Sequence, residues 1–154
     1  MIRLTRQADY GILLLVHVAG EPAGTVHAAP DLATATGVPV PMVSKILKAL
    51  ARGGLLVSHR GPHGGYNLAR SPRDISLVDI VEALEGPIAM TACTGHDPDC
   101  GLEGTCRVQP HWQHLNRAVV EALSRVNLAE MVRPSPERLV SIEAGSRTLS
   151  FPAQ

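Results

Sequence analysis

The chain has 154 residues, a formal net charge of zero and a hydrophobic content of 45%. This length suits one compact domain, or a small domain with an arm, and the apolar content is enough to build a core. No apolar run approaches the roughly 20 residues that a membrane-spanning helix needs, and the first residues lack a signal-peptide pattern. We therefore expect a cytoplasmic protein with no membrane partner.

The neutral average hides a separation of charge along the chain. From Leu32 to Arg73 there is no Asp or Glu, whereas six Lys or Arg occur, which leaves 8 of the 14 basic residues against all 14 acidic ones elsewhere. A stretch without carboxylates attracts phosphate, so it predicts contact with nucleic acid. The six basic residues are Lys45, Lys48, Arg52, Arg60, Arg70 and Arg73.

The first third of the chain reads as three helices. Thr5 is a suitable N-cap for an apolar core helix that runs to Gly20. A second, short helix begins near Pro30 and ends at Gly37, and a third follows within a few residues and ends at Gly53. Two short helices around a tight glycine turn predict a helix-turn-helix, whose later helix presents its polar side to DNA.

The third helix has one apolar and one polar face. Its apolar residues recur every three or four positions, at Val43, Ile46, Leu47 and Leu50. A solvated face of this kind usually mixes charges of both signs, and the missing carboxylates favour DNA contact instead. The N-terminal end of this helix lacks Arg, Asn and Gln, so the sequence does not indicate which bases it contacts. The predicted DNA-contact residues here are Pro41, Met42, Ser44, Lys45, Lys48 and Arg52.

A β-hairpin wing follows the third helix. Residues 55–60 and 66–69 are strand-like, and the glycine-rich stretch 61–65 between them predicts a tight turn. Arg60 and His63 flank the glycines, so we expect them to contact the minor groove or the phosphates. Ser76 then begins a helix with a capping-box pattern, which runs through Glu85 and closes at Gly86.

All three cysteines of the chain lie in the next segment. Cys93, Cys100 and Cys106 are separated by six and five residues in a loop rich in Gly and Asp. Thiolates bind iron-sulfur clusters and soft metals, and a reducing cytoplasm disfavours a disulfide. A structural zinc site is the alternative, although the segment lacks the Cys-x2-4-Cys pair common in such sites, and three unligated thiols are another.

From Pro110 the pattern is helical again. Apolar residues repeat at intervals of three and four, which predicts a two-heptad seam. Such a helix needs a partner, most simply its own copy in a two-fold homodimer. Beyond Arg133 the sequence loses periodicity and predicts a flexible tail. The predicted dimerisation residues are Trp112, Leu115, Val119, Ala122 and Val126.

Taken together, these motifs resemble the winged-helix iron-sulfur regulators that include IscR and NsrR, and more narrowly the regulators of SUF iron-sulfur assembly operons. The similarity rests on Arg3-Leu-Thr with Asp9-Tyr10, on the wing from Arg60 to Tyr66, and on three cysteines followed by Trp112. It implies a mainly α fold with a small β-hairpin wing and a long dimerisation helix. The implied parts are a DNA-binding domain over 1–86, a cluster loop over 87–109, the dimerisation helix over 110–132 and the tail over 133–154.

The resemblance also implies an iron-sulfur cluster in each subunit, 2Fe–2S or 4Fe–4S, held by the three cysteines. IscR-like proteins place a fourth ligand, His, three residues after the third Cys, where this chain has Gln109. NsrR-like proteins use an Asp in the first helix of the partner subunit, which matches Asp9. Asp9 and His111 are thus the two main candidates, with His96 and His114 behind them; Asp9 also reads as an ordinary acidic residue of a helix first turn.

The predicted function is a repressor of iron-sulfur assembly genes that binds double-stranded operator DNA and senses redox state or nitric oxide through its cluster. The rival from another class is an iron-sulfur scaffold or electron-transfer protein, and a constitutive winged-helix repressor with a structural zinc site is a third interpretation. The sequence shows no motif that pairs a nucleophile with a base, so we do not expect an enzyme.

Overall fold

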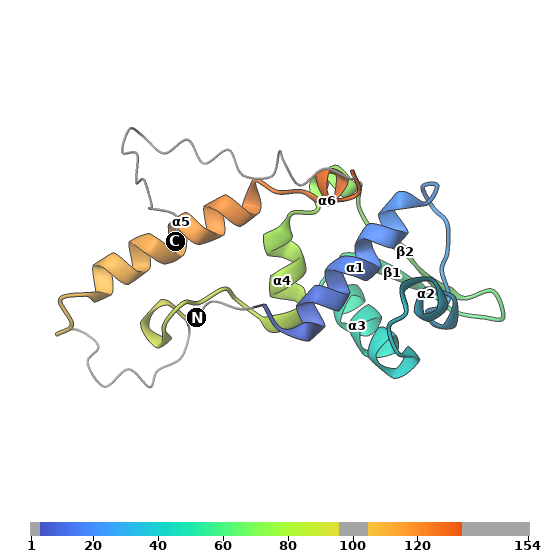
Figure 1. Ribbon diagram of the computed structural model, residues 1–154, viewed down its shortest axis with the longest axis horizontal. Helices are drawn as coiled ribbons and strands as arrows, with labels where there is room; N and C mark the ends of the chain where they lie inside the picture. Colours follow the sequence, from blue (N-terminus) through green and yellow to red (C-terminus); the bar gives the residue numbers. More distant parts are fainter. Residues whose placement is uncertain (1–3, 96–104, 134–154) are drawn as a thin grey trace, which may run out of the picture.

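The computed structural model describes residues 4–95 and 105–133. It is mainly helical with one two-stranded antiparallel hairpin, which confirms the predicted fold class. Figure 1 shows the first four α-helices and the hairpin gathered at one end, while α5 extends away from them. The elements are α1 Arg6–Gly20, α2 Ala29–Thr36, α3 Val40–Arg52, β1 Leu56–His59, β2 Gly65–Leu68, η1 Pro72–Asp74, α4 Leu77–Glu85, η2 Ala92–Thr94, α5 Gln109–Ser124 and α6 Leu128–Met131.

Local capping signals set the helix ends close to where the sequence predicts them. The Thr5 side chain accepts a hydrogen bond from the Ala8 N–H at 3.2 Å, which starts α1. Gly37 ends α2 with a φ of 74°, a left-handed conformation that suits glycine. Ser76 and Asp79 form the predicted capping box at the start of α4.

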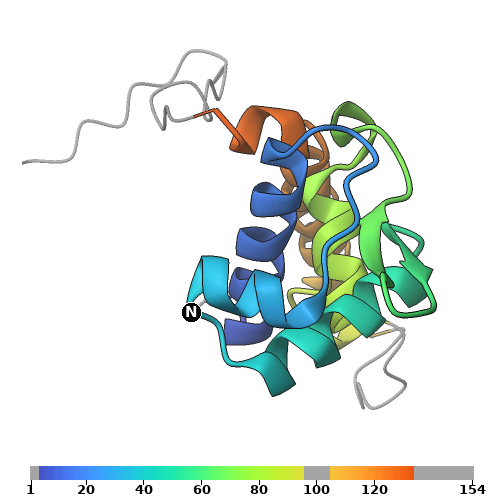
Figure 2. The same cartoon turned by 90° about the vertical axis from the view of Figure 1, so that its right-hand side faces the viewer.

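The core lies where α1 crosses α3 and α4, and Figure 2 shows these helices stacked around it. Each buried leucine or isoleucine there contributes on the order of 1.5–3 kcal/mol by leaving water. The core is aliphatic, as the low aromatic content requires. Its fully buried members include Leu14, Leu15, Ile46, Leu47, Leu50, Leu55, Ile75, Ile80 and Leu128.

The hairpin pairs Leu56 with Leu68 at its base and His59 with Gly65 near its tip. A third segment extends it, because the N–H groups of Tyr66 and His27 each donate to the other residue's carbonyl at 2.9 Å. Gly65 is required at this junction, since a Cβ there would lie 2.4 Å from the His27 carbonyl oxygen. The wing is thereby fastened to the loop that precedes α2.

Helix α5 is shorter than the predicted dimerisation helix over 110–132. It ends at Ser124, so Val126 falls outside it and does not continue the stripe. The reason is a backbone connection to the segment that leads into α4: Leu77 N–H donates to the Val126 carbonyl at 2.9 Å, and Leu128 N–H donates to the Ile75 carbonyl at 2.8 Å. The chain then forms α6, whose Leu128 is buried in the core, so the segment after Ser124 belongs to the winged-helix body.

Candidate nucleic-acid interface and cysteine segment

Helix α3 buries its apolar face completely, with Val43, Ile46 and Leu47 at 0% exposure. This orientation leaves the opposite face in solvent. The DNA-contact candidates divide accordingly: Met42 and Ser44 are half-buried, and Met42 packs against the core. The exposed ones, which lie on one side of the helix, are Pro41, Lys45, Lys48 and Arg52.

The basic residues of the carboxylate-free stretch are not equivalent. Arg70 lies 3.7 Å from the Asp79 carboxylate and donates to the Asp74 carbonyl at 3.2 Å. Within the described part of the chain, Lys45, Lys48 and Arg52 form no ion pair. The charge on α3 is therefore available to a phosphate, whereas part of the charge of Arg70 is used inside the domain.

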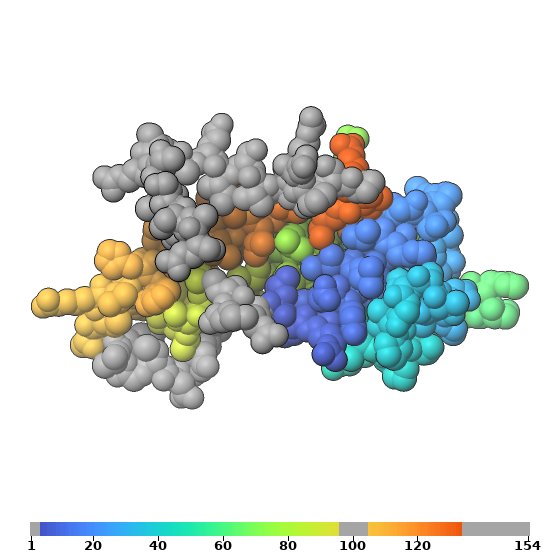
Figure 3. Space-filling view, viewed as in Figure 1, coloured from blue at the N-terminus to red at the C-terminus, as the bar shows by residue number. Residues whose placement is uncertain are grey.

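Arg60 and His63, the predicted DNA contacts of the wing, are both exposed near its tip. Figure 3 shows this tip projecting at the right-hand end, beyond the helices. Two glycines shape it: Gly61 has a φ of 106°, and a Cβ on Gly64 would lie 2.4 Å from the His59 carbonyl oxygen. Between the strands, His59 Nε2 and Asn67 Oδ1 form a hydrogen bond of 2.9 Å.

Two of the three cysteines lie in the described residues. Cys93, in η2, is half-buried, and its Sγ lies 3.2 Å from the Thr91 hydroxyl; Cys106 is half-buried just before α5. Both are free thiols, whereas Cys100 lies outside the described residues, as does His96. Partly buried thiols, one of them in contact with a hydroxyl group, fit thiolate ligation of a soft metal or a cluster.

Within the described residues, the candidate fourth ligands do not complete a metal site. Asp9 is exposed in the first turn of α1, and His111 and His114 are exposed on α5. Among residues 4–95 and 105–133, no three His, Cys, Asp or Glu side chains are grouped so that they could hold a metal ion. The part of the chain that is described therefore brings neither Asp9 nor His111 into a three-residue group with Cys93 and Cys106.

One amide side chain joins the cysteine segment to α5, and the sequence analysis missed it. Asn116 Oδ1 accepts from the Met90 N–H at 3.0 Å, and its Nδ2 donates to the Ile88 carbonyl at 3.0 Å. The side chain thus pairs with the backbone as a neighbouring strand would. Because η2 also packs against α5, these two hydrogen bonds hold residues 88–90, which precede Cys93, against α5.

A second long-range contact also escaped the sequence analysis. The Glu85 carboxylate accepts from the Thr5 N–H at 3.0 Å and from its hydroxyl at 2.7 Å. Gln7 Nε2 donates to the Leu84 carbonyl at 3.1 Å, so the end of α4 is attached to the start of α1. Residues 80 positions apart are joined here, and local patterns carry no signal for such a pair.

The outer face of α5 is uncovered. None of its residues is buried, and Trp112 and Leu115 are 36% and 43% exposed. Val119 is half-buried and Ala122 is exposed on the same helix. The predicted dimerisation residues Trp112, Leu115, Val119 and Ala122 therefore lie on α5, and their pairing with a second copy stays a prediction.

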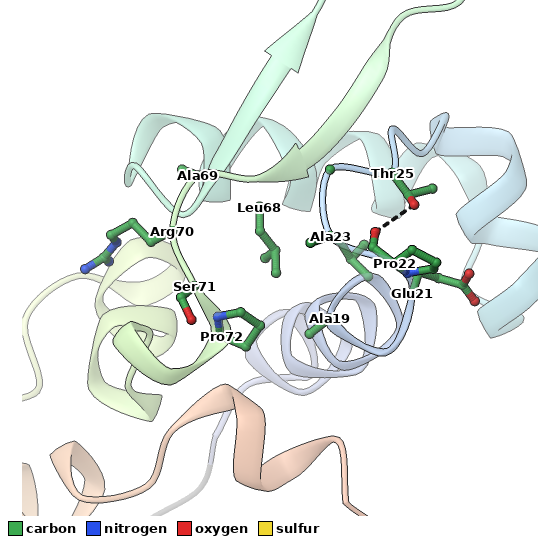
Figure 4. Close-up of a pocket in the computed structure, with 12 residues that line it drawn as sticks. Ala19, Glu21, Pro22, Ala23, Thr25, Leu68, Ala69, Arg70, Ser71 and Pro72 are labelled. Atoms are coloured by element: carbon green, nitrogen blue, oxygen red, sulfur yellow. Dashed lines mark hydrogen bonds between the residues drawn. The ribbon is translucent and has the colours of Figure 1, made fainter.

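A pocket of about 380 Å³ lies between the C-terminal end of α1 and the segment 68–72 (Figure 4). Its walls include Ala19, Pro22, Leu68 and Pro72, and the Arg70 side chain points away from it. Its lining also includes the polar residues Glu21, Thr25 and Ser71, and the Thr25 hydroxyl is already hydrogen-bonded to the Pro22 carbonyl.

A helix-turn-helix with a free basic face and an adjoining hairpin defines a winged-helix DNA-binding protein. Over residues 4–134 the chain matches the Rrf2 family, described as iron-dependent transcriptional regulators, and it belongs to that family. It is thus a transcriptional regulator rather than an enzyme. Within the described residues, every helix is too short or too polar to cross a bilayer.

Relatives and solved structures agree with this assignment. The chain is 30% identical over 132 residues to protein rrf2 of Nitratidesulfovibrio vulgaris, covering 86% of this chain and 88% of that protein. CymR, the global cysteine regulator of B. subtilis, matches with a TM-score of 0.68 and 25% identity, over 86% and 97% of the two chains. IscR of T. potens matches with a TM-score of 0.64 and 25% identity, over 85% and 86%.

Proposed function

We propose that the chain is a homodimeric, cytoplasmic regulator whose affinity for operator DNA depends on an iron-sulfur cluster. Cys93, Cys100 and Cys106 hold the cluster in each subunit, and Asp9 of the partner subunit or His111 completes the ligand set. The similarity to IscR supports this assignment, as does the presence of two half-buried free thiols close to α5. Bound to these thiolates, the cluster supplies a group that responds to oxidation or nitric oxide.

The observation that carries the proposal is a continuous path of contacts from the cysteine segment to the DNA face. Segment η2, which bears Cys93, packs on α5, and Asn116 clamps its leading residues there. Helix α4, which packs against α5, also packs against α3. A change in the cysteine segment therefore has a packed route to the helix that carries Lys45 and Lys48.

The predicted dimer gives this route its effect. Two α3 helices bind successive major-groove faces only if their separation matches the DNA repeat, and α5 sets that separation when it pairs with its copy. A displacement of η2 on α5 shifts the equilibrium between binding and non-binding spacings. The resemblance to regulators of SUF operons further suggests that this protein represses the genes of SUF iron-sulfur assembly.

Anaerobic purification followed by iron, sulfide and zinc analysis, with a visible spectrum, tests the cofactor. Equal amounts of iron and sulfide with broad absorbance near 400 nm are expected. A colourless protein that binds zinc and takes up no cluster on reconstitution would instead favour a constitutive repressor with a zinc-filled loop. Cluster transfer to acceptor proteins, without preference for any DNA sequence, would favour the scaffold or electron-transfer function.

A further inference from the structure

The first turn of α3 presents apolar side chains at the position where a recognition helix meets base edges. Val40 is 44% exposed, and Pro39 and Pro41 on either side of it are exposed as well. Val40 is not among the residues packed against the core, so a large part of its apolar surface stays in contact with water. Its neighbours on the same face are the charged Lys45 and Lys48, which argue against an apolar protein partner.

The same turn is poor in hydrogen-bond donors. Pro39 and Pro41 have no N–H group. The N–H groups of Met42 and Val43 donate to the Pro39 carbonyl at 2.9 and 3.0 Å, so they are used inside the helix. This helix end therefore offers few of the free N–H groups that usually hold a phosphate, and anchoring falls to the basic residues further along α3.

Helix geometry places Val40 and Pro41 beside the polar side chains that follow. Residues one turn apart are neighbours, so Val40 lies next to Ser44 and Pro41 next to Lys45. All four fall on an arc of about 140° when successive residues turn by about 100°. In a major groove this arc meets neighbouring base pairs. The side chains of Val40 and Pro41, in the first turn, have no group that can donate a hydrogen bond to a base or accept one from it.

We propose that Val40, with Pro41, reads the 5-methyl group of thymine in the major groove and so determines specificity for an A·T pair within each half-site. This inference rests on the proposed DNA-binding function. Thymine is the base whose major-groove edge carries an apolar group, so it is the one that an apolar side chain can recognise by burial. Burying one methyl changes affinity roughly fourfold.

Uracil substitution tests the proposal, because uracil pairs as thymine does but lacks the methyl group. High-affinity duplexes are first selected from a random pool with the purified full-length protein, and each thymine of the selected half-site is then replaced by uracil. For the wild type, we expect roughly fourfold weaker binding at one or two positions. Val40→Ala should bind the thymine duplex more weakly and should lose this uracil sensitivity.

Val57→Ala is the matched control, because Val57 is 43% exposed on β1 and lies outside α3. This variant should keep the wild-type response to uracil. A wild type that binds thymine and uracil duplexes equally at every position would overturn the proposal, as would undiminished uracil sensitivity in Val40→Ala. If selection enriches no sequence at all, the proposed operator-binding function fails instead, so the two failures are distinguishable.

Discussion

Replacing Asn116 by Ala should loosen the cysteine segment from α5 while leaving the winged helix folded. The change removes two hydrogen bonds of 3.0 Å each, to the Met90 N–H and the Ile88 carbonyl. A hydrogen bond contributes about 0.5–1.5 kcal/mol net, so the pair accounts for about 1–3 kcal/mol. The side chain is only half-buried, which allows water to replace part of this and favours the lower half of that range.

Amide hydrogen exchange of Met90 is the assay that localises the effect. In Asn116→Ala its exchange should become roughly five- to thirtyfold faster, while amides in the α1 and α3 core stay protected. Asn116→Asp keeps the acceptor for Met90 but loses the donor to Ile88, so its exchange should be intermediate. Gln113→Ala, an exposed change on the same helix, is the control. Unchanged Met90 exchange in Asn116→Ala would refute the clamp.

Three further predictions concern the first domain. Lys48→Ala should reduce the slope of log affinity against log salt by about 0.9, the loss of one phosphate contact, and an unchanged slope would remove Lys48 from the interface. Gly65→Ala places a Cβ 2.4 Å from the His27 carbonyl oxygen and should lower the free energy of unfolding in urea by about 1–3 kcal/mol. Gly20→Ala is the control and should not destabilise the protein, because its Cβ would lie 3.8 Å from its nearest neighbour, a methyl group of Val132. Burial, and then the neighbouring His17, lower the pKa of His27 from its ordinary 6.5, so the folded state resists the proton that the unfolded chain accepts. The free energy of unfolding should therefore fall as pH drops below about 6.5, and His27→Gln should reduce this dependence while His63→Gln should not.

Helix boundaries were predictable because their causes are local. Thr5, Gly37 and Ser76 cap helices through contacts with residues three or four positions away, and the structure places the ends of α1, α2 and α4 there. The apolar repeat of α3 likewise defines its buried face. Helix α5 was predicted to continue through Val126 but ends at Ser124, because a 3.5-residue repeat cannot reveal the backbone hydrogen bond from Leu77 to Val126.

The contacts that join the cysteine segment to the rest of the protein could not be predicted. Asn116 and Glu85 act across 26 to 80 positions, and their own neighbourhoods give no periodic or motif signal. Val40 was overlooked for a different reason, because an apolar residue in a helix suggests the core and only the structure shows it exposed. The cysteine ligand set and the dimer seam stay predictions.

Titration of one selected operator duplex with the same protein in its cluster-loaded and cluster-free states tests whether the cluster controls DNA binding. Fluorescence anisotropy at fixed salt gives both affinities, and reconstitution shows whether a change is reversible. We expect a difference of roughly tenfold or more. Reconstitution should restore the affinity of the cluster-loaded state, and the variant with Cys93, Cys100 and Cys106 replaced by Ala should show no difference. Superimposable curves for protein with and without confirmed cluster would contradict cluster control of DNA binding.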